Sequence, residues 1–103
     1  MQVDLIIMVI CQEHNIKKEQ FFSRSRKTNL VKARQRFSYI ARKLLGTEEI
    51  PFSLHKIGNI LNQDHSTIIH SINVVKNDIE IYNENTIIEK IIEKIYQNNI
   101  QHQ

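Results

Sequence analysis

The chain has 103 residues, the size of one ordinary domain, so we expect residues 1–103 to form a single unit. Two glycines and one proline are too few for the tight turns of an all-β fold, whereas nineteen isoleucines suit an aliphatic helical core. The net charge of +3 hides an uneven distribution, because residues 17–43 hold ten basic residues and one acid, a net +9, and the remainder carries −6.

An apolar run at residues 5–11 predicts a first helix from about Asp4 to His14, which Asn15 then ends. Seven apolar residues cannot cross a bilayer, which needs about 20, and neither a basic segment nor a cleavage site marks a signal peptide. We therefore expect no membrane segment. The lone Cys11 excludes an internal disulfide and is best explained as a small core residue in a reducing cytoplasm.

The basic segment contains the second predicted helix. Residues 16–22 are expected to form a short packed turn ahead of this helix, and Asn29 is expected to cap it. Its apolar positions recur at helical spacing: Leu30, Phe37, Ile40, Ala41, Leu44 and Leu45. Gly46 stands where a left-handed residue often ends a helix, and residues 47–52 are predicted to form a loop.

The remaining residues predict three more helices. Ser53 caps a short helix, residues 62–63 form a tight turn, and Asp64 caps the next helix. The predicted inward-facing residues of these two helices are Leu54, Ile57, Ile60, Leu61, Ile68, Ile69, Ile72, Val75, Ile79 and Tyr82. A last amphipathic helix covers residues 86–96. The predicted fold class is all-α, a compact bundle of five to six helices containing a helix-turn-helix at about residues 53–83.

The helix-turn-helix predicts a chemistry as well as a fold. In this motif the N-terminus of the second helix enters the DNA major groove, so side chains of its first turn reach base edges. Asp64, His65, Ser66 and Thr67 form that first turn, and His70 lies one turn further along the same face. A carboxylate accepts from cytosine, hydroxyls bond bases or phosphates, and a threonine methyl packs on thymine. The +9 segment agrees with a polyanionic ligand, the alternative being a solvated basic helix.

Residues 64–70, Asp-His-Ser-Thr-Ile-Ile-His, resemble the DHTTVLH signature of the C-terminal DNA-binding domain of the bacterial replication initiator DnaA. Two further motifs occur in the order of that family: residues 33–44 resemble its (A/P)RQ helix, and residues 54–58 resemble its LPxIG element. The resemblance runs from about Met8 to Ile95 and implies a Trp-repressor-like helix-turn-helix. It implies sequence-specific binding of double-stranded DNA at a short box, as in recognition of a replication origin.

The resemblance also implies roles for individual residues. The candidates for base contacts are Arg26, which falls on the family's minor-groove arginine, and His55, Asp64, His65, Ser66 and Thr67. The candidates for phosphate contacts are Arg24, Lys27, Arg34, Gln35, Arg42 and His70. Phosphate contacts fix the register of a protein on the duplex, whereas base contacts supply specificity. A minor-groove arginine senses mostly groove width and A·T character.

The sequence departs from the family pattern in ways that bear on the DNA target. His55 stands where the family has proline, Ser66 stands where it has threonine, and the turn at residues 62–63 is one residue shorter and lacks an arginine. Each changed base contact is worth about 1–3 kcal/mol of discrimination, so the resemblance implies DNA binding without determining the exact box. The family's ATPase domain is absent from these 103 residues, which predicts either a domain excised from an initiator or a natural short protein.

Catalytic and metal-binding functions are disfavoured. His65 and His70 are five residues apart, about 140° around a helix, so they do not form a zinc site, and we expect no metal or other cofactor. Asp64 and His65 are adjacent at a helix start and do not face each other, so we expect no enzyme.

Protein partners remain as alternatives. The last predicted helix carries an isoleucine stripe, expected to be core, with a homo-oligomer or protein-partner interface as the alternative: Ile87, Ile88, Ile91, Ile92 and Ile95. The alternative function is a helical protein-interaction module, or a regulator that competes for or modulates the initiator rather than starting replication. In each case we expect a cytoplasmic protein, associated with the nucleoid if it binds DNA.

Overall fold

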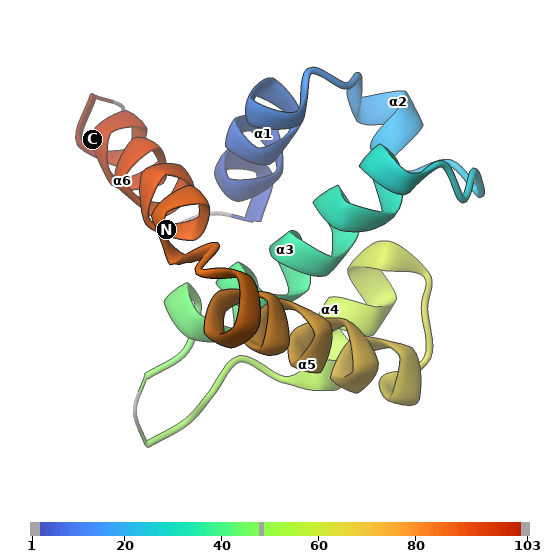
Figure 1. Cartoon of the computed structure of the whole chain (residues 1–103). Coiled ribbons are helices and arrows are strands. Elements are labelled where there is room, and N and C mark those ends of the chain that lie inside the picture. Colours follow the sequence, from blue (N-terminus) through green and yellow to red (C-terminus); the bar gives the residue numbers. More distant parts are fainter. Residues whose placement is uncertain (1–2, 48, 102–103) are drawn as a thin grey trace.

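The computed structural model describes residues 3–47 and 49–101, and every regular element within them is a helix (Figure 1). The helices are α1 (Val3–His14), α2 (Lys18–Phe21), α3 (Thr28–Leu44), α4 (Leu54–Leu61), α5 (His65–Tyr82) and α6 (Asn85–Gln101). The predicted all-α class and helix-turn-helix are confirmed. The two ends of the predicted 1–103 unit, and Glu48 of the predicted loop, lie outside the described residues. None of the described helices is long and apolar enough to cross a membrane.

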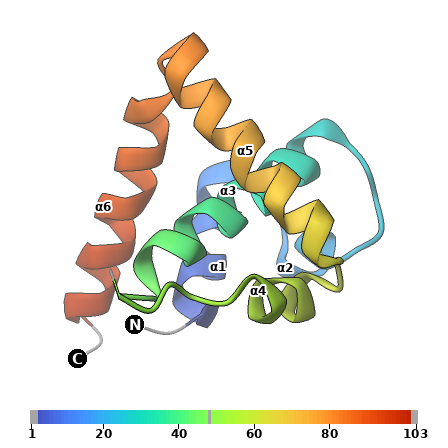
Figure 2. The same cartoon turned by 90° about the horizontal axis from the view of Figure 1, so that it is seen from below.

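Helix α3 is the centre of the fold, because it contacts each of the other described helices. Helices α1 and α6 pack together on one side of α3, while α4 and α5 cover another (Figures 1 and 2). The buried core is aliphatic apart from Cys11 and two phenylalanines, Phe21 and Phe37, whose ring centroids lie 5.7 Å apart in an edge-to-face arrangement. This contact holds α2 against α3, next to the basic loop that follows α2.

Asparagine, rather than glycine, ends three of the helices. Asn15, Asn62 and Asn83 follow α1, α4 and α5, and each has a φ of 53°. Asparagine tolerates this left-handed conformation better than other residues with a side chain. The prediction of a left-handed Gly46 is wrong, because no described glycine has a positive φ. Glycine is needed at position 46 for a different reason, which is space. A Cβ on residue 46 would lie 2.3 Å from the backbone nitrogen of Phe52.

Helix α3 begins earlier than the sequence predicts. Its N-cap is Lys27, and the predicted cap Asn29 lies inside the helix, where its side-chain amide donates to the carbonyl of His14 at 2.9 Å. Asn29 therefore ties α3 to the end of α1, a contact between distant segments that local pattern does not indicate. The predicted turn at residues 16–22 is likewise wrong in part, because residues 18–21 form a helical turn, α2.

Two residues expected to face the core of α5 are exposed. Ile69 is 39% exposed because it lies about 100° around the helix from its buried neighbour Ile68. Tyr82 is 70% exposed at the last position of the helix. The buried side of α5 is narrower than predicted, and the exposed surface of this helix includes the apolar side chain of Ile69.

The last helix is longer than predicted, and its isoleucine stripe is mainly core. Ile88, Ile91 and Ile95 are buried against α1, whereas Ile87 is 42% exposed. Charged pairs support the same contact, since Glu13 of α1 forms salt bridges with Lys90 and Lys94 of α6. Packing against α1 thus extends α6 past residue 96 to Gln101.

The turn between α4 and α5 depends on close packing around Gly58. The backbone N–H groups of Asn62 and Gln63 both donate to the Gly58 carbonyl, the latter at 2.9 Å. The turn also brings the Gln63 carbonyl oxygen to within 2.5 Å of the place that a Cβ on residue 58 would occupy. Only glycine lets the chain turn this sharply into α5.

We predict that Gly58→Ala destabilises the domain, although alanine favours a helix by about 1 kcal/mol over glycine. The added methyl would press on a backbone carbonyl that cannot move without opening the turn. The free energy of unfolding, measured by urea denaturation, should fall by about 1–3 kcal/mol. Asn59→Ala, at the exposed neighbouring position, is the matched control and should be neutral or slightly stabilising. Unchanged stability of Gly58→Ala would contradict this account of the turn.

Candidate nucleic-acid interface

The first turns of α4 and α5 are each fixed by a side-chain cap. Ser53 Oγ accepts from the backbone N–H of His55 at 3.1 Å and of Lys56 at 3.4 Å. Asp64 Oδ1 accepts from the backbone N–H of Thr67 at 2.7 Å. Both predicted caps are confirmed. The hydrogen bonds from Thr67 favour the charged carboxylate and lower the pKa of Asp64.

The two caps bring a pair of histidines together at the surface. The rings of His55 on α4 and His65 on α5 are stacked, with centroids 5.0 Å apart and an angle of 25° between their planes. Both side chains are exposed, as is Ser66 beside them. The turn therefore presents two imidazoles and a hydroxyl as one polar surface at the start of α5. The position that the sequence marked as a departure, His55, is part of this surface.

The basic loop between α2 and α3 is organised by a buried arginine. Arg34 is only 9% exposed, and its guanidinium donates to four carbonyls, two at the end of α2 and two in the loop. Nε donates to Phe21 at 2.8 Å, Nη1 to Ser25 at 2.7 Å, and Nη2 to Ser23 at 2.7 Å and Gln20 at 3.2 Å. Burial lowers the pKa of Arg34 from its ordinary value. These bonds give Arg34 a task that the sequence did not indicate, which is to hold the loop in one shape.

The loop and the helix-turn-helix border a single cleft of about 620 Å³. Its lining includes six of the predicted site residues: Arg24, Arg26, Arg34, Gln35, Thr67 and His70. They come from the loop, from α3 and from α5, so the cleft lies where these three segments meet. The fold thus joins a cationic loop to the polar end of a recognition-type helix, although these segments are about forty residues apart in the sequence.

The other predicted residues lie outside this cleft. His55, Asp64, His65 and Ser66 form the exposed tip of the helix-turn-helix, beyond the cleft lining. Lys27 is exposed at the N-cap of α3. The sequence did not identify several residues that line the cleft as site residues: Phe22, Ser23, Val31, Leu61, Asn62, Gln63 and Ser71. Asn62 and Gln63 directly precede the family motif at residues 64–70, so their position in the turn could have identified them as candidate site residues.

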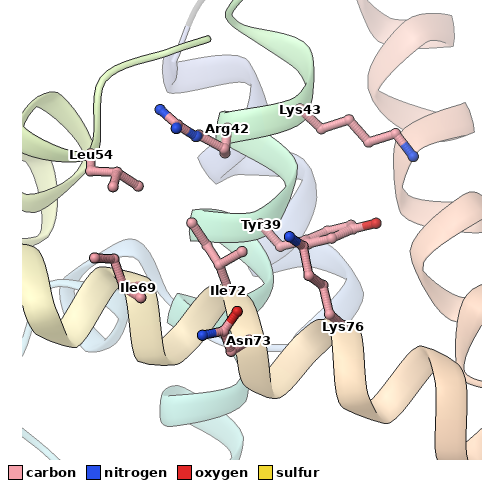
Figure 3. Close-up of a pocket in the computed structure, with 8 residues that line it drawn as sticks. All are labelled: Tyr39, Arg42, Lys43, Leu54, Ile69, Ile72, Asn73 and Lys76. Carbon is pink, nitrogen blue, oxygen red and sulfur yellow. The ribbon is translucent and has the colours of Figure 1, made fainter.

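Arg42 lies in a second cavity, of about 380 Å³, between α3, α4 and α5 (Figure 3). Its Nη1 donates to the carbonyl of Phe52 at 2.5 Å, which fixes the guanidinium beside the start of α4. The same cavity is lined by Tyr39, Lys43, Leu54, Ile69, Ile72, Asn73 and Lys76. The sequence did not identify Lys43 or Lys76 as site residues.

The described residues contain no group of three or more histidine, cysteine, aspartate or glutamate side chains that could hold a metal ion. What they do contain is a capped helix-turn-helix with an arginine-bearing cleft on one side. These features define a helix-turn-helix protein of the nucleic-acid-binding class.

Comparison with known proteins identifies the family within this class. The family model for "Bacterial dnaA protein helix-turn-helix" matches residues 3–75. Proteins named "Chromosomal replication initiator protein DnaA" match at 40% identity over 78 residues in Thermoanaerobacter sp. (strain X514) and at 32% over 80 residues in Bacteroides thetaiotaomicron. The chain belongs to the bacterial DnaA helix-turn-helix family. These matches cover 76% and 77% of this chain but only 16% of each relative.

We predict that Arg34→Ala loosens the loop and lowers the free energy of unfolding by roughly 1–3 kcal/mol, because four carbonyls lose the hydrogen bonds that Arg34 donates. Arg34→Lys should be nearly as unstable, since an ammonium cannot reproduce the planar fork of donors. Denaturation measures the loss of stability, and the rate of tryptic cleavage at Arg24 and Arg26 measures the loosening of the loop. Arg24→Ala, which removes an exposed side chain, is the control for stability. Wild-type stability in Arg34→Lys would show that charge alone is sufficient.

We also predict a pH signature of the α5 cap. The pKa of Asp64 is lower in the folded state than in the unfolded state, where it is near 4. The ionised carboxylate therefore stabilises the fold fully above the unfolded pKa, and this stabilisation is lost as the pH falls through the folded pKa. Asp64→Asn can cap the helix without titrating. The stability difference between wild type and Asp64→Asn should therefore shrink between pH 6 and pH 3. Ser66→Ala is the control: it keeps the Asp64 carboxylate and removes no titrating group, so it should keep the pH dependence of the wild type.

Proposed function

We propose that this chain binds double-stranded DNA sequence-specifically, in the manner of DnaA-box recognition. The observation that carries the proposal is the cleft in which Arg24 and Arg26 face the α5 residues Thr67 and His70. A helix of about 10–12 Å diameter fits the major groove, and a cationic loop beside its first turn then lies near the adjacent minor groove. One rigid surface would therefore contact two neighbouring grooves.

The base contacts in this proposal come from two places. Asp64, His65, Ser66 and Thr67 would contact base edges in the major groove together with His55, whose ring is stacked on that of His65. Arg26 would enter the minor groove. Because His55 and Ser66 differ from the family pattern, we expect the preferred site to be a variant of the DnaA box.

The phosphate contacts come from the residues around these points. Arg24, Lys27, Gln35, Arg42 and His70 have side chains that are exposed or partly exposed near the cleft or the start of α4. Arg34 would act mainly through the loop that it holds. A protein that binds such a site works in the bacterial cytoplasm, at the nucleoid. Any partner or second copy would have the exposed residues of α6, such as Ile87 and Ile100, available for contact.

Fluorescence anisotropy with a DnaA-box duplex and a scrambled duplex of equal length tests the proposal. We predict tighter binding to the box, and a preference that narrows about fivefold or more in Arg26→Ala and in Ser66→Ala, since a base contact is worth about 1–3 kcal/mol. Arg24→Ala should weaken both complexes alike and reduce the salt dependence. Equal affinity of the wild type for the two duplexes would reject DnaA-box recognition and favour the protein-interaction alternative.

A further inference from the structure

The cavity between α3, α4 and α5 has a cationic rim over an apolar floor. Arg42, Lys43 and Lys76 line it, Leu54, Ile69 and Ile72 contribute its apolar part, and none of the described residues around it is acidic. Lys43 Nζ lies 5.8 Å from the centre of the Tyr39 ring, a cation–π contact that keeps the ammonium near the cavity. Figure 3 shows Tyr39, Arg42 and Lys43 on α3, with Arg42 and Lys43 extending in opposite directions in this view, and Asn73 and Lys76 on α5. Lys43 and Lys76 are exposed, so their charges face solvent.

This cavity and the loop cleft lie on opposite faces of α5. Thr67, His70 and Ser71 line the loop cleft, whereas Ile69, Asn73 and Lys76 line the second cavity. At about 100° per residue, the centres of these two sets are about half a turn apart. The exposed ridge between them, which includes Ser66, points away from the buried side of α5. The recognition-type helix therefore has an exposed polar edge with positive charge on both flanks.

Two cationic flanks suit the shape of a DNA groove. The major groove is bordered by the phosphates of both strands, about 12 Å apart, so a helix that fills it faces one backbone on each side. We propose that Arg42, Lys43 and Lys76 form a second phosphate-binding site, which holds the strand on the flank of α5 away from the loop. This inference rests on the proposed function and adds Lys43 and Lys76 to the DNA-binding residues.

An acidic protein segment is the other polyanion that could match these charges. The placement favours DNA, because the cavity opens beside the same exposed ridge that bears Ser66 and because the loop cleft supplies the matching site on the opposite flank. A peptide site would not require two cationic sites symmetrically placed about one helix.

The test compares wild type with Lys43→Gln, Lys76→Gln and the double variant on the box and scrambled duplexes over a range of salt concentrations. We expect each substitution to weaken both complexes by up to about fivefold and to lower the slope of log K against log salt by about 1, while the preference for the box is kept. Lys90→Gln on α6, which packs on the far side of the domain against α1, removes the same charge and should change neither quantity.

Phosphate-ethylation interference on each strand gives a second, independent readout. The double variant should lose interference at phosphates of one strand, and Arg24→Ala should lose it at phosphates bordering the groove on the loop side. An unchanged salt slope together with an unchanged interference pattern would overturn the second site while leaving box recognition intact. Failure of the wild type to bind either duplex would instead reject the proposed function. Thermal denaturation of the variants confirms that the exposed substitutions leave the fold unchanged.

Discussion

The hydrogen bonds of Arg34 hold together the part of the molecule on which the candidate interface depends. Its guanidinium sits on α3, inside the domain, and fixes the carbonyls of residues 20, 21, 23 and 25. A loop that carries several like charges would otherwise spread in solution, because its own side chains repel one another. One buried cation thereby keeps the exposed arginines of the same loop beside α5. Desolvation of this charge is compensated by four acceptors, which is the condition for burying an arginine at little cost.

Helix α5 serves a different purpose on each of its faces. Ile68, Ile72 and Val75 are buried against the core, while Ser66 and Asn73 are exposed. The loop cleft and the second cavity, between α3, α4 and α5, lie on the two flanks of α5 between its buried face and its exposed face. The buried face gives the helix a fixed orientation, and the Asp64 cap and the Gly58 turn fix where it begins. A helix held in this way can present its first turn to a rigid ligand without paying to order it at the moment of binding.

Much of this arrangement was predictable from the sequence. Helical spacing, the Ser53 and Asp64 caps and the short turn between them identify the helix-turn-helix, because each of these signals is local. The motif at residues 64–70 points to the family, which the comparisons confirm. Two of the errors arise from contacts beyond the nearest neighbours: Asn29 bonds the end of α1 instead of capping α3, and Gly46 accommodates the chain at Phe52 instead of turning left-handed. Neither contact is visible to a rule that examines only neighbouring residues.

The sequence by itself determined the helices, their caps, the strongly basic segment and the residue types offered to DNA, because these follow from spacing and composition. Only the tertiary structure decided which charges act together. It buried Arg34 and left Arg24 and Arg26 exposed, although all three belong to the same basic segment. It also brought Lys43 and Lys76, 33 positions apart in the numbering, to one cavity. The physical reason is that burial and proximity depend on how helices pack, and packing joins residues whose separation along the chain carries no local signal.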